Sequence, residues 1–368
     1  MDIRRLIGLF VLLVGLMLFA RQGCADSWQN AVSSRASIEY ETNPAMIPAN
    51  PGSVRRILFE PSFTLVGQIG ANELETGLAL QVARSSNHNL SPNREDPSVY
   101  FDWSHHSDAG ELGLSSRYAE IATRDAGIDA TRPVPVSSTR ASRTMSGRMS
   151  KDLSERNSLS AEGSFEGVSY KGGGNYVDYS TRSGSLRLSN AISELSTIFL
   201  SVSGDKYVPT DGGPSSRHAV ATLGLDWKLE YMDWSMRLGR YKGGGSTGME
   251  GGASVHYTGQ QAQLALNANR QISSSGLGGF VKVDQLVGNW NYALSERDNI
   301  GIDLQWWKNL STTFSNIRTT TGIWLQHNLS PSWSGRMNYL HNILTGGGVF
   351  SASSNIIGVS LVYTNSDF

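Results

Sequence analysis

The sequence predicts an all-β fold, a transmembrane, antiparallel up-and-down β-barrel of about 18 strands. Two observations predict this fold. After the first 25 residues, large apolar side chains recur at every second position instead of at the 3.6-residue spacing of an amphipathic helix. The connections between these segments alternate between tight and long, as in outer-membrane barrels with short periplasmic turns and long extracellular loops.

The composition excludes several other classes of protein. The 368 residues include 31 basic and 32 acidic side chains, so the formal charge of −1 offers no basic surface to nucleic acid. Hydrophobic residues make up 39% of the chain, too many for a disordered protein, and a negative mean hydropathy argues against a bundle of membrane helices. Cys24 is the single cysteine, so we expect no disulfide framework, no cysteine-based metal site and no cofactor.

The N-terminus has the composition of a secretory signal. Two arginines precede an almost wholly apolar stretch at residues 6–20, and small residues surround Ala25. We expect cleavage after Ala25, which divides the chain into a signal peptide at 1–25 and an outer-membrane β-barrel at 26–368. An uncleaved anchor is the alternative, but the apolar stretch is short for a helix that crosses a membrane.

Period-two alternation divides the rest of the chain into strands. At residues 299–306 the even positions carry Ile, Ile, Leu and Trp, whereas Asp303 and Gln305 occupy odd positions. Each such segment has one apolar and one polar face, which suits either a soluble sandwich or a membrane barrel. The predicted strands cover residues 35–43, 57–70, 73–85, 97–107, 111–124, 142–153, 157–171, 176–192, 195–208, 216–229, 231–242, 251–259, 262–273, 279–294, 298–310, 316–329, 332–344 and 354–365.

Connection lengths favour the barrel over the sandwich. Every second connection is tight, as at residues 71–72 and 193–194, and the others are longer and rich in Gly, Pro and Ser. An even strand number leaves both termini in the periplasm, and closure removes sheet edges whose unpaired backbone groups would be costly in lipid. The longer connections include residues 86–96, 126–141, 209–215, 243–250 and 345–353.

The C-terminal segment predicts how the barrel is assembled. Residues 357–363 alternate cleanly up to Tyr363, and the chain ends on Phe368. A terminal Phe resembles the recognition signal that outer-membrane barrels present to their assembly machinery. Phe368 and Tyr363 are therefore the candidate assembly signal, and the barrel assembly machinery is an expected partner.

Short motifs in the first two strands and in the tight turns resemble one family. They are the segments at 38–44 and 60–65 and the Leu-Ser-Glu-Arg turns at 153–156 and 294–297. Together they resemble the outer-membrane β-barrel porin family that is encoded with bacterial exopolysaccharide biosynthesis genes. This resemblance implies a role in moving or organising secreted polysaccharide.

A barrel of this size encloses an aqueous lumen lined by the polar strand faces. Both charge signs occur on these faces, together with two Trp residues that could stack on sugar rings. The residues could contact a solute, or they could pair across neighbouring strands and hold the wall rigid. The candidate lumen-lining residues are Arg117, Arg148, Arg187, Arg237, Arg336, Asp102, Glu162, Glu166, Asp226, Asp303, Trp307 and Trp324.

Catalysis is not expected from the sequence. The seven His residues are spread over the predicted strands and loops, with His105 and His106 together on one strand, and no spacing pairs one of them with a Ser nucleophile and an orienting acid. His105 and His106 point to opposite faces of one strand and cannot form a metal pair. The Gly runs at 172–174, 243–245 and 346–348 lack the Lys-Ser or Lys-Thr of a phosphate-binding loop.

We therefore expect an outer-membrane channel of a Gram-negative bacterium that exports a polysaccharide through its polar lumen. The alternatives are a general diffusion porin for small polar solutes and a structural or adhesive barrel. Expected partners are outer-membrane lipid, the polysaccharide and a periplasmic polysaccharide-export protein, because the chain has no large periplasmic domain to bridge to synthesis. Much of this functional expectation depends on analogy at the level of the fold.

Overall fold

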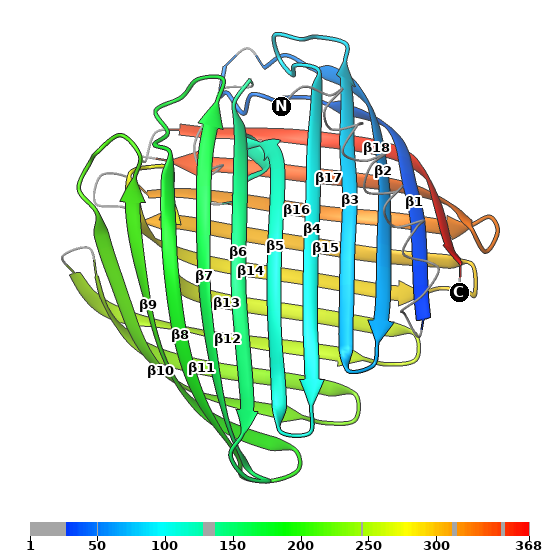
Figure 1. Ribbon diagram of the computed structural model, residues 1–368. Coiled ribbons are helices and arrows are strands. Elements are labelled where there is room, and N and C mark those ends of the chain that lie inside the picture. Colours follow the sequence, from blue (N-terminus) through cyan, green and yellow to red (C-terminus); the bar gives the residue numbers. More distant parts are fainter. Residues whose placement is uncertain are drawn as a thin grey trace.

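The computed structural model describes residues 27–49, 51–127, 137–243, 246–310, 315–346 and 350–367. Within them the chain forms one closed antiparallel barrel of 18 strands and one short 3₁₀ helix, as the sequence predicts (Figure 1). The elements are β1 (Ser27–Glu41), β2 (Val54–Ile69), β3 (Asn72–Ser85), β4 (Arg94–Ser107), β5 (Gly110–Ala122), η1 (Thr123–Asp125), β6 (Thr139–Asp152), β7 (Asn157–Lys171), β8 (Tyr179–Ala191), β9 (Ser196–Pro209), β10 (Ser216–Lys228), β11 (Met232–Gly243), β12 (Ser246–Thr258), β13 (Ala262–Ser275), β14 (Gly279–Ala293), β15 (Asp298–Leu310), β16 (Ser315–Asn328), β17 (Trp333–Gly346) and β18 (Phe350–Asp367).

Each strand pairs with the next in sequence, and β1 pairs with β18 to close the barrel. Ile38 of β1 stands opposite both Ile57 of β2 and Val359 of β18. Closure gives each of the described strands two partners, so none of them is an edge strand along its whole length. No helix among the residues that the structure describes is long and apolar enough to cross a membrane.

Several strands extend further than the sequence predicts. The expected loops at 243–250 and 345–353 are largely strand, because Gly243 pairs with Ser246 and Gly346 with Phe350. The first strand begins at Ser27 rather than at residue 35. Gly- and Ser-rich ends lack the apolar alternation that marks lipid-facing strand, but their backbones still pair with the neighbouring strands.

The outer surface carries a band of exposed apolar side chains. Leu188 and Leu200 are neighbours in register, and Leu200 in turn faces Leu223. Their exposed fractions are 47%, 52% and 60%. A continuous apolar surface of this kind is unfavourable in water but is typical of a barrel wall in contact with lipid. The band fits the hydrocarbon of an outer membrane, and the residues that alternate with it face the lumen.

The end of the β13–β14 hairpin, around Ser275 and Gly279, leaves the wall and bends into the lumen. β12 and β13 pair only over Gly251–Thr258 and Gln263–Arg270, so the last part of β13 has no partner in β12. The Tyr207 hydroxyl of β9 donates to the Ser275 carbonyl at 3.3 Å, and the Tyr207 and Phe280 rings lie 6.0 Å apart. The hairpin end is therefore held against the inner wall of β9.

Candidate functional site: a charged constriction

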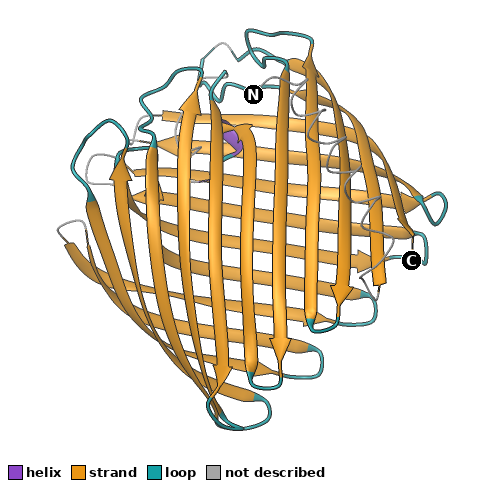
Figure 2. Cartoon of the chain, in the orientation of Figure 1, coloured by secondary structure: helices purple, strands orange, loops and turns teal. Residues whose placement is uncertain are grey.

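A second segment enters the lumen between β5 and β6. It contains η1, which lies inside the barrel wall in Figure 2. At its base Thr123, which is fully buried, shares a hydroxyl–hydroxyl hydrogen bond of 2.9 Å with Ser138, and the Thr123 amide donates to the Ser138 carbonyl at 3.0 Å. These two bonds close the base of the segment, from which η1 extends into the lumen.

The described part of this segment, η1 with Gly127, reaches β15 and β16. Arg318 of β16 donates from Nη1 to the Arg124 carbonyl at 2.5 Å, and Gly127 lies against the indole ring of Trp307 on β15. Arg124 in turn donates from Nη1 to the Pro44 carbonyl of the β1–β2 connection at 3.3 Å. Because β15 and β16 lie nearly opposite β5 in the closed strand order, this segment bridges the lumen.

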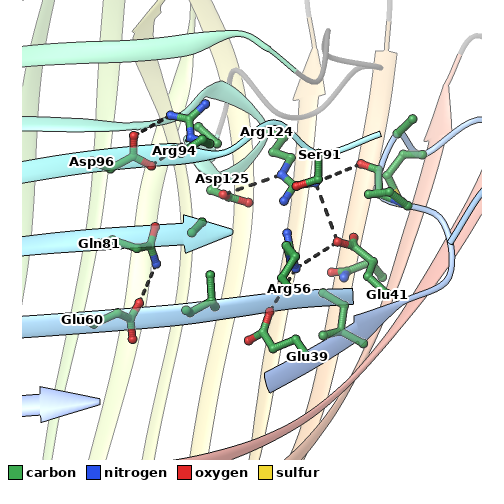
Figure 3. Close-up of a pocket in the computed structure, with 18 of the residues that line it drawn as sticks. Glu39, Glu41, Arg56, Glu60, Gln81, Ser91, Arg94, Asp96, Arg124 and Asp125 are labelled. Carbon is green, nitrogen blue, oxygen red and sulfur yellow. Dashed lines mark hydrogen bonds and ion pairs between the residues drawn. The ribbon is translucent and has the colours of Figure 1, made fainter. Parts of the chain in front are cut away.

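The bridge covers a polar cavity of about 220 Å³ against the inner wall of β1 to β4 (Figure 3). Arg56 lies between two carboxylates, with Nη2 3.1 Å from Glu39 Oε2 and 2.9 Å from Glu41 Oε2. Arg124 lies 3.7 Å from the same Glu41 oxygen. The first strand, the second strand and η1 thus meet at one buried carboxylate.

Two further pairs complete the cavity wall. Arg94 forms a bidentate ion pair with Asp96, with bonds of 3.0 and 2.8 Å, and this geometry fixes the guanidinium plane. Gln81 donates to Glu60 at 2.5 Å. Arg35 Nε stays 4.0 Å from Glu60 and has no hydrogen-bond acceptor among the described residues.

Among the arginines that line this cavity, the positive charge of Arg318 is the least compensated by carboxylates. Its hydrogen bond ends on a carbonyl, and none of the carboxylates that the structure describes lies within ion-pair distance of it. Arg56 Nε is also buried without an acceptor in the described part of the chain. Donors left without acceptors at a constriction favour a solute that carries acceptor oxygens.

The predicted lumen-lining residues all lie on the lumen face of their strands, and one of them, Trp307, contacts Gly127 of the bridge. The others are spread around the wall, and most of them have partners on the adjacent strand or on the next strand but one. Neither Asp102 nor Glu162 has an ion pair with a described residue. The partners are Glu111 for Arg148, Asp226 for Arg187, Arg140 for Glu166, Asn269 for Arg237 and Asn289 for Asp303.

Aromatic rings hold three of the predicted arginines. The guanidinium carbon of Arg187 lies 3.6 Å from the Phe199 ring centroid, which is a close cation–π contact. Arg336 lies 4.1 Å over the predicted Trp324, and Arg117 lies 5.8 Å from Tyr100. These contacts agree with wall pairing as the role of the residues concerned.

Sequence reasoning missed most of the cavity residues. Their strands were recognised, and the alternation at 35–43 already places Glu39 and Glu41 on one face. The missing information was that η1 folds inward onto this part of the wall. Of the other predicted sites, Tyr363 packs on Trp333 at 4.9 Å near the periplasmic end, while Phe368 and Ala25 lie outside the described residues.

Comparison with known proteins identifies the fold. No protein-family model matches the chain, and no curated protein matches its sequence. Among solved structures, the outer membrane protein OpdK of Pseudomonas aeruginosa superposes with a TM-score of 0.53 and 10% identity over 94% of this chain and 100% of its own. OccAB4 of Acinetobacter baumannii gives a TM-score of 0.52 and 9% identity, covering 93% of this chain and 99% of its own.

A third similar structure is a complex with a sugar acid. OccK2 (OpdF) of P. aeruginosa, solved with glucuronate, gives a TM-score of 0.52 and 11% identity over 94% of this chain and 100% of its own. OpdK has also been solved with vanillate. These neighbours are outer-membrane proteins, and the likeness shows that the chain shares their fold, a closed antiparallel barrel of 18 strands among the described residues. The closed barrel with its exposed apolar band belongs in the outer membrane of a Gram-negative bacterium.

Proposed function

We propose that the protein is a porin that admits small polar solutes and prefers anionic ones. The observation that carries this proposal is the bridge across the lumen, which brings the incompletely neutralised Arg318 next to the cavity arginines. A water-filled barrel narrowed at one level selects solutes by size and by the charges at that level. Carboxylates and phosphates suit guanidinium donors best.

The structural neighbours support this class of function over polymer export. Glucuronate and vanillate, named with two of them, are both small carboxylates. The fold likeness agrees better with a small-solute porin than with the polysaccharide conduit expected from the sequence. A bridge across the lumen also favours small solutes, because a polymer chain would have to displace it.

Polysaccharide export is the second candidate, and it rests on the resemblance of the segments at 38–44 and 60–65. It requires a periplasmic export partner and an opening of the bridge. Signal cleavage after Ala25 and recognition of Phe368 by the assembly machinery are needed in either case, and they remain proposals.

The test is solute uptake by liposomes that contain the purified barrel. Glucuronate should enter several times faster than glucose, which has a similar size but no charge, and an anionic octasaccharide should be excluded. Equal rates for glucuronate and glucose would refute the anion preference. Entry of the octasaccharide at a comparable rate would favour the polysaccharide conduit instead.

A further inference from the structure

Three basic side chains lie side by side on the outer face of the barrel. Arg182 of β8 stands directly opposite Lys206 of β9, and Lys206 stands directly opposite Arg217 of β10. Arg182 and Arg217 are exposed and Lys206 is half-buried. Side chains alternate between the two faces of a strand, and each cation is an even number of residues from an exposed apolar side chain of its own strand. These side chains are Leu186, Val202 and Leu223, so the three cations point away from the lumen.

Like charges that face each other directly in a sheet are destabilising. No carboxylate among the described residues forms an ion pair with Arg182, Lys206 or Arg217. Lys242 of β11 and Lys282 of β14 line the same hollow as these three, together with the lumen-facing Asp205, and neither lysine has an ion pair with a described carboxylate. The positive charges of the cluster are therefore not balanced by the protein, and a bound anion would balance them.

The position of the cluster identifies the kind of anion. The three residues lie just beyond the band of exposed leucines, on the side of the longer connections and away from the termini. In an outer-membrane barrel that side faces the exterior, so the cluster is level with the outer-leaflet headgroups. Arginine pairs give bidentate bonds to phosphate, and basic pockets at membrane surfaces bind lipid headgroups.

The surface below the cluster has room for an acyl chain. Gly147, Gly163, Gly184 and Gly204 are consecutive register partners on the outer face, and Ala219 continues the row. Interior strand glycines are unfavourable in themselves and often mark a close approach of another molecule. On β8 to β10 the row leaves a shallow strip between the cations and the apolar band, and on β6 and β7 it continues beside the exposed Met145 and Phe165.

We propose that Arg182, Lys206 and Arg217 bind a phosphate group of an outer-leaflet phosphorylated glycolipid, whose acyl chain lies over the glycine row. This site is separate from the lumen and does not depend on which solute passes through the channel. It would fix the rotation of the barrel relative to its lipid shell and offset the repulsion between the three cations.

Native mass spectrometry of the purified barrel tests the site. The probes are lipid A with its two phosphates and the same glycolipid after phosphate removal. The triple variant Arg182→Gln, Lys206→Gln, Arg217→Gln should bind phosphorylated lipid A at least tenfold more weakly than the native protein. Dephosphorylated glycolipid should bind both proteins equally, and inorganic phosphate should not replace the lipid.

The matched control removes three other outward-facing cations that are not register partners of one another. The variant Arg55→Gln, Arg143→Gln, Lys308→Gln should retain lipid A affinity within about threefold of the native value. An equal loss in the control and test variants would show general charge attraction and overturn the proposal. Unchanged binding in the test variant, or equal binding of the two glycolipids, would also overturn it.

Unfolding in urea provides a second readout that does not depend on detecting bound lipid. In neutral phosphatidylcholine bilayers the test variant should unfold at higher urea than the native barrel, because repulsion is removed. In bilayers that contain lipid A the order should reverse. The same order in both bilayers would refute the proposal.

Discussion

Arg318→Gln is the sharpest test of the constriction. The change removes the cavity cation that has no carboxylate within ion-pair distance in the described structure, while the Thr123–Ser138 bonds and the Arg124–Pro44 bond still hold the bridge. The bridge should therefore remain in place, and conductance should change little. The substitution removes only the positive charge that faces the passing solute.

The size of the effect follows from Coulomb's law. A carboxylate about 4 Å from a unit positive charge gains about 1 kcal/mol in bulk water and about 4 kcal/mol at the effective dielectric constant of a protein surface. The lumen is wet, so we expect a value near the lower limit, about 1 to 1.4 kcal/mol. Each 1.4 kcal/mol is tenfold, so the anion-to-cation permeability ratio should fall about five- to tenfold.

The assay is the reversal potential of single channels in a planar bilayer with a salt gradient. Arg318→Lys keeps the charge and should retain most of the native selectivity. Arg237→Gln removes a lumen cation that lies outside the cavity lining and donates to Asn269, so it serves as the matched control. If Arg237→Gln shifts the reversal potential as much as Arg318→Gln, anion selection arises from the whole lumen and the constriction is not its source.

Three other substitutions test the remaining parts of the fold. Thr123→Val removes the buried hydroxyl bond to Ser138, worth about 1 kcal/mol, so single-channel recordings should show more frequent opening to a larger conductance, whereas unchanged noise would argue against the bridge. Tyr207→Ala removes the 1%-exposed ring beneath the β13–β14 hairpin, at a cost of about 3 to 5 kcal/mol, and the hairpin should become accessible to protease in intact vesicles; continued protection would contradict its docking. Leu200→Arg places a charge on the lipid face and should lower the free energy of unfolding by about 2 to 4 kcal/mol in urea titrations, while Ser201→Arg, which faces the lumen, should cost much less; equal losses would contradict the assigned faces.

The direction in which each strand residue points was determined by the sequence alone. Asp303 and Trp306 sit on opposite faces because side chains alternate along a strand, and lipid accepts only the apolar face. The strand number followed from the same alternation. The strand ends did not, because a residue such as Ser246 pairs through its backbone whatever side chain it carries.

The constriction was decided only by the tertiary structure. Arg124 and Arg318 are far apart in sequence and meet because η1 leaves the end of β5 and extends through the lumen to β16. The burial of Glu41 likewise depends on η1 folding inward over it. Period-two patterning reports which face a residue occupies, but it contains no information on which loops enter the lumen, because that depends on contacts between strands that are distant in the chain.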